Sequence, residues 1–213
     1  MSQVIAEDRS VPATVWDGGV SPYKIGHKKL GMWLFILSDS LTFSALLFGY
    51  SYVRMSTPNW PTPFDFSPGI LYATVMTACL LSSSLTMVMA VNASAKGDRG
   101  AVVKWIGATM LGGLAFLVLH IREWFHLIDE GLKPFASPAA WGPSTPLFGG
   151  TFFTITGLHM FHVLTGVIYL GVIAARKKSN HEDVEICGLY WHFVDLVWMF
   201  VFPLIYIMSI KAK

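Results

Sequence analysis

Ionisable side chains recur at helical spacing inside long apolar stretches of this sequence. Two pairs, His159 with His162 and His192 with Asp195, are separated by three residues and therefore share one face of a helix. Two further apolar stretches carry the rest of the set, which consists of Asp39, His120, Arg122, Glu123 and His126. Imidazole and carboxylate groups are ligands of haem and of di-iron centres, so oxygen activation at a metal is the first chemistry that these residue types suggest.

Five apolar stretches must position these groups. Each has about the 20 residues that a helix needs to cross a hydrocarbon core of about 30 Å, and turn-forming residues separate the stretches. Hydrophobic residues make up 54% of the chain and charged residues only 13%, against roughly 25% charged in a soluble domain. The sequence therefore predicts an all-α, polytopic membrane protein with spans at about 30–52, 69–91, 102–128, 147–174 and 186–210.

Basic residues are unevenly distributed between the two sides of these spans. With the N-terminus inside, the inner segments hold most of the 15 lysines and arginines, and the outer segments hold only Arg54, Lys133, Lys211 and Lys213. Because cytoplasmic loops carry the excess of basic residues, we expect a cytoplasmic tail at 1–29, one membrane domain at 30–210 and an external end at 211–213. The net charge of +2, without a long run of like charges, gives no indication of a nucleic-acid partner.

Metal chemistry is one of two interpretations of the ionisable set. A di-iron site in a helical bundle takes about four carboxylates at one depth, whereas the inner half of the predicted spans offers only Asp39 and Asp195. A bis-histidine haem needs two histidines at matched depth on facing helices, which His162 and His192 could provide. In the other interpretation the groups hydrogen-bond between helices and to lipid headgroups. The small number of carboxylates favours this second interpretation.

Four of the apolar stretches carry segments that resemble the subunit III family of haem-copper oxidases. The segments read LGMWLFILSD at 30–39, REW at 122–124, FGGTFF at 148–153, TGLHMFHV at 156–163 and YWHFVDLVW at 190–198. They occur in the family's order, and the last is nearly the family signature. With five predicted spans, the chain is similar to the short bacterial form, which lacks the first helix pair of longer members. Asp39 stands where the family usually has Glu, so its carboxylate has a shorter reach.

The resemblance implies a non-catalytic subunit of a proton-pumping terminal oxidase, which reduces oxygen to water in aerobic respiration. It implies no catalytic residue, no metal ligand and no cofactor in this chain, because subunit I of the family's complexes holds the haems and copper. Subunit I, subunit II, and small subunits or a respiratory supercomplex would be the protein partners, in the bacterial inner membrane. The first two spans would form one bundle and the last three another, around a cleft that binds phospholipid.

The resemblance also implies roles for particular side chains. These would contact lipid headgroups or bridge helices, and the subunit would thereby stabilise subunit I and support proton uptake and durable turnover. The side chains that match the family's positions are those of Asp39, Glu123, His159, His162, His192 and Asp195.

Other functions stay open on the sequence alone. A subunit III-like chain could serve a quinol oxidase or a nitric oxide reductase, because partner subunits decide the electron donor. A self-sufficient haem or di-iron membrane enzyme is the alternative from a different class, and it would show iron or a haem absorption band in the isolated chain. A small transporter would predict inverted repeats and broken helices, and the sequence shows neither.

Overall fold

The computed structural model describes residues 26–133, 144–176 and 180–210. Its long helices are α1 (His27–Ser56), α2 (Leu71–Ala95), α3 (Arg99–Asp129), α4 (Thr145–Ala175) and α5 (His181–Val201). The π-helical turn η1 (Phe66–Ile70) precedes α2, and α5 continues into the π-helical turn η2 (Phe202–Tyr206) and the 3-10 turn η3 (Ile207–Ser209). Within these described residues, five helices are long and apolar enough to cross a membrane, which confirms the all-helical, polytopic class. The predicted end 211–213, and the predicted tail as far as residue 25, lie outside the described residues.

A short turn makes α2 and α3 antiparallel neighbours. Gly97 has a φ of 73°, which glycine adopts without strain, and Asp98 then caps α3 by accepting the N–H of Ala101 at 3.0 Å. Along the shared face, a Cβ atom at Gly112 would lie only 2.6 Å from the Cβ atom of Ser83. The missing side chain at Gly112 therefore permits the close approach that small residues provide between membrane helices.

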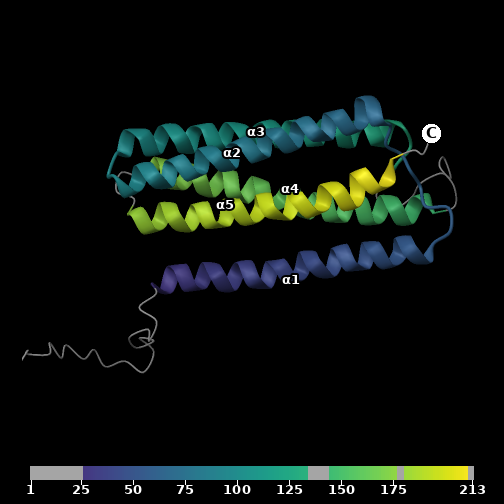
Figure 1. Ribbon diagram of the computed structural model, residues 1–213, viewed down its shortest axis with the longest axis horizontal. Helices are drawn as coiled ribbons and strands as arrows, with labels where there is room; N and C mark the ends of the chain where they lie inside the picture. Colours follow the sequence, from purple (N-terminus) through teal and green to yellow (C-terminus); the bar gives the residue numbers. More distant parts are fainter. Residues whose placement is uncertain (1–25, 134–143, 177–179, 211–213) are drawn as a thin grey trace, which may run out of the picture.

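α1 lies on one side of the other four helices (Figure 1). α2 packs on α3 and α5, and α4 packs on the same two helices, so these four form the core, whereas α1 contacts α5 and, less extensively, α4. This corrects the expected division into a two-helix and a three-helix bundle around a cleft, because α2 belongs to the core. The short turn holds α2 against α3, while the proline-rich connection 57–70 is long enough to separate α2 from α1.

α1 buries only a narrow stripe of its surface. The stripe repeats every seven residues and consists of Ile36, Phe43 and Tyr50. At the far end of the helix the hydroxyl of Tyr50 lies 3.3 Å from Oγ of Ser209, and Arg54 donates to the carbonyl oxygen of Met208. Most other large apolar side chains of α1 are exposed, as suits a helix that faces lipid or another subunit.

Candidate functional site

A carboxylate–imidazole pair joins α1 to α4. Oδ2 of Asp39 lies 2.9 Å from Nε2 of His162, and the two side chains are 15% and 9% exposed. On the other side of the ring, Nδ1 of His162 lies 2.7 Å from the carbonyl oxygen of Leu158. Because a carbonyl oxygen only accepts hydrogen bonds, Nδ1 carries a hydrogen. The short carboxylate of Asp39 is therefore long enough to reach a partner inside the chain.

The hydrogen on Nδ1 determines how many protons, and hence what net charge, the pair of His162 and Asp39 carries. A bare Nε2 nitrogen facing a carboxylate would place two acceptors together, so one further proton must lie between His162 and Asp39. With that proton on either group, the pair carries no net charge. An ionisable pair without net charge suits the low-dielectric space between membrane helices. Phe43 packs against the His162 ring, with ring centroids 5.3 Å apart.

Glu123 is paired with a residue that the sequence pattern does not single out. The hydroxyl of Tyr206 donates to Oε2 of Glu123 at 2.7 Å, and both side chains are buried. Tyr206 ends the π-helical turn η2, within which Pro203 has no backbone N–H to give to a helix. The wider turn changes the face on which residue 206 lies, so regular helical spacing from Asp195 does not locate it. The contact joins α3 to the end of the last span.

His120 and His159 lie in an aromatic cluster between α3, α4 and α5. The His159 ring stacks on Trp198 with centroids 5.1 Å apart, and His120 meets the same indole edge-on at 5.4 Å. Phe116 lies against both imidazole rings. Both histidines are completely buried, so the structure places them within the packed core.

His192 and Asp195 lie against α2. Nδ1 of His192 lies 2.7 Å from Oγ of Ser84, and Asp195 lies beside the same hydroxyl. Two indoles of α5 also donate to hydroxyls of α2, namely Trp191 to Ser83 at 3.1 Å and Trp198 to Thr77 at 2.9 Å. Asp39 and Asp195, which share the inner half of the predicted spans, therefore have partners on different helices.

The described residues offer no ready metal site. In 26–133, 144–176 and 180–210, no group of three or more His, Cys, Asp or Glu side chains lies together so that it could hold a metal ion. The two histidines considered for a haem, His162 and His192, meet Asp39 and Ser84 respectively. In the part of the chain that the structure describes, no such group of side chains is available as the ligand set that the metal interpretation requires.

One end of the bundle, here called the basic end, is where α1, α3 and α5 begin and α2 and α4 end (Figure 1). Two ion pairs join α1 to α5 there, Lys28 with Asp183 at 3.0 Å and Lys29 with Glu185 at 2.7 Å. Arg99 donates to the carbonyl oxygen of Ala174 at 2.7 Å, close to the C-terminus of α4. The segments at this end are those that the charge pattern predicts to be cytoplasmic.

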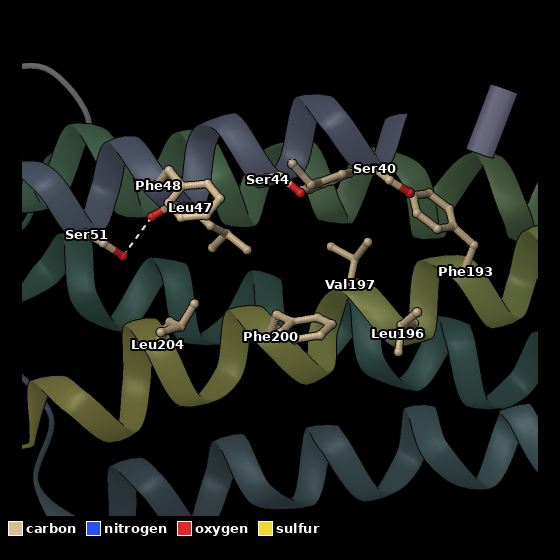
Figure 2. Close-up of a pocket in the computed structure, with 11 residues that line it drawn as sticks. Ser40, Ser44, Leu47, Phe48, Ser51, Phe193, Leu196, Val197, Phe200 and Leu204 are labelled. Carbon is tan, nitrogen blue, oxygen red and sulfur yellow. Dashed lines mark hydrogen bonds between the residues drawn. The ribbon is translucent and has the colours of Figure 1, made fainter. Parts of the chain in front are cut away.

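A groove of about 420 Å³, here called the mid-bundle groove, separates α1 from α5. Figure 2 shows Leu47 of α1 and Val197 of α5 pointing toward one another across it, with Phe200 further along α5. Serines also line the α1 side, but the Ser51 hydroxyl donates to the carbonyl oxygen of Leu47 at 2.8 Å. The Ser40 hydroxyl bonds back to its own helix in the same way, so the lining offered to an occupant is mainly apolar.

A second groove, here called the basic-end groove, has a volume of about 510 Å³ and lies between α1, α2 and α5. His192 lines it, together with Lys29 and Glu185. Asp39, Glu123, His159, His162 and Asp195 line neither groove. The structure thus brings the predicted polar residues into interhelical contacts, and of these six residues His192 is the one that lines either of these two grooves.

Comparison with known proteins gives a consistent result. A model of the family described as cytochrome c oxidase subunit III matches residues 20–210. Cytochrome bo(3) ubiquinol oxidase subunit 3 of Pseudomonas aeruginosa is 33% identical over 190 residues, which cover 86% of this chain and 86% of that protein. Cytochrome c oxidase subunit 3 of Alkalihalophilus pseudofirmus is 32% identical over 190 residues, covering 86% and 88% of the two chains.

A third relative carries a different name. Quinol oxidase subunit 3 of Bacillus subtilis is 30% identical over 187 residues, which cover 85% of this chain and 87% of that protein. The named relatives thus include both cytochrome c and quinol oxidase subunits, and the family match extends over all five helices. The chain therefore belongs to the cytochrome c oxidase subunit III family of haem-copper oxidase subunits.

Proposed function

We propose that this chain is a non-catalytic subunit of a proton-pumping oxidase that reduces oxygen to water in a bacterial inner membrane. It packs against the haem-bearing subunit I, stabilises it and supports its proton uptake. The observation that carries this proposal is the family match over residues 20–210. The contacts of the ionisable groups agree with it, because Asp39 and Glu123 meet partners within the chain.

The apolar outer surface of the helices supports a role inside a larger membrane assembly. On α1, Leu41 is 66% exposed and Phe48 is 77% exposed, and α3 and α4 also carry exposed leucine, valine, isoleucine and phenylalanine side chains. In a bilayer these surfaces contact acyl chains or the helices of other subunits. Subunit I, subunit II and any smaller subunits are the proposed protein partners.

The lipid part of the proposal concerns the two grooves beside α1. An open groove inside a bilayer is filled by acyl chains when no helix fills it, because water gains no hydrogen-bond partners from an apolar lining. The mid-bundle groove has such a lining, with Leu47, Val197 and Phe200. A phospholipid held there would strengthen the weak contact between α1 and α5.

Affinity purification of the tagged chain from its native membrane tests the subunit assignment. We expect a haem-bearing large subunit to co-purify in equal amount, and we expect the chain separated from it to lack a Soret band. A Soret band or stoichiometric iron in the isolated chain would instead support the self-sufficient enzyme. Co-purification without any haem protein would contradict the oxidase assignment.

A quinol oxidase is the second candidate for the complex. The relative from Pseudomonas aeruginosa, at 33% identity over 190 residues, is named as a ubiquinol oxidase subunit, and relatives of comparable identity are named as cytochrome c oxidase subunits. Oxygen consumption by the purified complex with reduced cytochrome c or with a quinol distinguishes the two donors. Faster turnover with the quinol would select the second candidate.

A further inference from the structure

Ser84 of α2 lies between two ionisable side chains of α5. Its Oγ atom is 2.7 Å from Nδ1 of His192, and Asp195 lies beside the same hydroxyl. His192 and Asp195 are three residues apart and share one face of α5. Asp195 is buried, and within the described residues its Oδ1 atom has no hydrogen-bond partner. A buried carboxyl group with an unpaired oxygen and a hydroxyl beside it is able to bind a proton.

The order of the three groups favours proton transfer over nucleophilic catalysis. In a catalytic triad the imidazole lies between the hydroxyl and the carboxylate, and it takes the proton of the hydroxyl. Here the hydroxyl of Ser84 lies between the imidazole of His192 and the carboxyl group of Asp195. Because a hydroxyl both donates and accepts hydrogen bonds, Ser84 can pass a proton between its two neighbours.

Two hydrogen-bonding arrangements satisfy these groups, and they differ by one proton. In the first, Nδ1–H of His192 donates to Ser84, and the Ser84 hydroxyl donates to the Asp195 carboxylate. In the second, Asp195 is a carboxylic acid that donates to Ser84, and Ser84 donates to Nδ1. Passing from the first to the second adds one proton at Nε2 of His192, moves the Nδ1 proton to Ser84 and moves the Ser84 proton to Asp195. His192 is neutral in both arrangements, so the net change is one proton gained by Asp195.

The basic-end groove connects His192 to the end of the bundle. Polar side chains form its mouth, among them Lys29 and Asn92, and His192 lines it deeper inside. From His181 at the start of α5 to His192 is about 16 Å, at about 1.5 Å per residue. The groove volume of about 510 Å³ is many times the share of about 30 Å³ that one water molecule occupies. Asp195 does not line the groove, so protons from water reach it through the ring of His192.

The other charged and titratable groups around this path have partners of their own. They are Lys29 with Glu185 at 2.7 Å, His181 with Ser94 at 3.3 Å, Asp39 with His162 at 2.9 Å, and His159 stacked on Trp198. These groups come from α1, α4 and α5, and α2 contributes Ser84, which does not ionise at ordinary pH. Within the described residues, the contact of Asp195 is therefore with a neutral hydroxyl that can carry a proton to it.

We propose that Ser84, His192 and Asp195 form a proton-binding site that is loaded through the basic-end groove. His192 takes a proton from water, Ser84 passes one on, and Asp195 holds it; release follows the same path in reverse. The proposal rests on the proposed support of proton uptake, and it names the residues of this chain that bind the proton. The site opens at the end that the charge pattern predicts to be cytoplasmic.

Infrared spectroscopy of the whole purified complex tests this proposal. A carboxylic acid absorbs separately from a carboxylate, so protonated Asp195 is followed as the carboxylic-acid band that Asp195→Asn removes. We expect this band to grow as the pH of the medium falls and to shift when water is replaced by D₂O. Ser84→Ala should slow that exchange about tenfold, the factor that the loss of one hydrogen bond supplies. Ser84→Thr should keep the fast exchange, because it retains the hydroxyl.

Ser82→Ala is the matched control. Ser82 also lies on α2, but its hydroxyl donates to the carbonyl oxygen of Cys79 at 2.9 Å, so exchange should stay at the wild-type rate. The amount of chain per haem, measured on every variant, separates loss of proton transfer from failure to assemble. If Ser84→Ala does not assemble, His192→Phe replaces it and should slow the exchange at least as much.

Three results would overturn the proposal. They are an Asp195 band that does not change with pH, unchanged exchange in Ser84→Ala or its replacement His192→Phe, and equal slowing in Ser82→Ala. All of these results leave the subunit assignment standing, since that depends on co-purification with a haem protein.

Discussion

Asp39 is placed where an isolated carboxylate would be costly. An Asp side chain at the centre of a membrane helix costs about 2.5–3.5 kcal/mol on insertion scales, and His162 offsets that cost by sharing one proton with it across 2.9 Å. The fixed Nδ1 hydrogen on His162 means that Nε2 can accept from a neutral group as well as donate to a charged one. The pair is therefore best understood as a hydrogen bond with no net charge.

We predict that Asp39→Asn preserves the attachment of α1 and that Asp39→Leu weakens it. The asparagine amide can donate to Nε2 of His162, whereas leucine leaves this buried nitrogen without a partner, at a cost of about 1–3 kcal/mol. The measurement is the temperature at which the chain dissociates from the purified complex. Equal loss of stability in the two variants would show that the pair depends on full charges.

We predict that Glu123→Ala shortens the working life of the complex more than it lowers the initial rate. The change leaves the buried hydroxyl of Tyr206 without its acceptor, at about 1–3 kcal/mol, and Glu123→Gln should be milder because an amide oxygen still accepts. Oxygen consumption is followed through continuous turnover, comparing the first minute with the half-time of activity loss. A lower initial rate with an unchanged half-time would contradict a structural role for this contact.

Individual residues differ in how far the sequence reveals them. Spacing of three or four residues identifies His192 and Asp195 as neighbours on one face, and the structure places both against Ser84. The same spacing cannot identify Tyr206 as the partner of Glu123, because that contact depends on the π-helical turn before it. Polar residues on one helix are thus predictable from periodicity, whereas their partners depend on how the helices pack.

At the scale of the elements, hydropathy determines the five helices but not their neighbours. Apolar length alone gives α1 through α5, since backbone groups in a bilayer must be satisfied within each helix. Which helices touch depends on connection length and on close contacts such as Gly112 against Ser83. The expected pairing of the first two spans is wrong for this reason, as α2 packs on α3 and α5.

We predict that Gly112→Ala destabilises the chain by about 1–3 kcal/mol through overpacking against α2. A Cβ atom there would meet Ser83 at 2.6 Å and the backbone oxygen of Cys79 at 3.1 Å. Gly107→Ala on the same helix is the matched control, because its Cβ atom would meet nothing within 4 Å. It should be neutral or stabilise the helix by about 0.5–1 kcal/mol. Thermal unfolding of the purified complex compares them, and equal midpoints would contradict the close α2–α3 contact.

At the scale of the whole molecule, charge separates the two ends of the bundle. Lys28, Lys29 and Arg99 meet carboxylates or helix carbonyls at the basic end, while Arg54 lies at the opposite end of α1 and donates to Met208. Basic residues remain on the cytoplasmic side during insertion. The sequence pattern thus predicts which end of the bundle faces the cytoplasm. The arrangement of the helices is consistent with this prediction, because the helices gather the predicted inner segments at one end.

We predict that the basic end faces the cytoplasm. After Cys79 and Cys187 are replaced by alanine, single cysteines are introduced at Ser56, exposed at the end of α1 away from the basic end, and at Ala175, exposed at the basic end. A membrane-impermeant maleimide added to intact spheroplasts should modify only the first, and both should react after lysis. The opposite pattern would invert the topology and place the ion pair of Lys29 and Glu185 on the outer side.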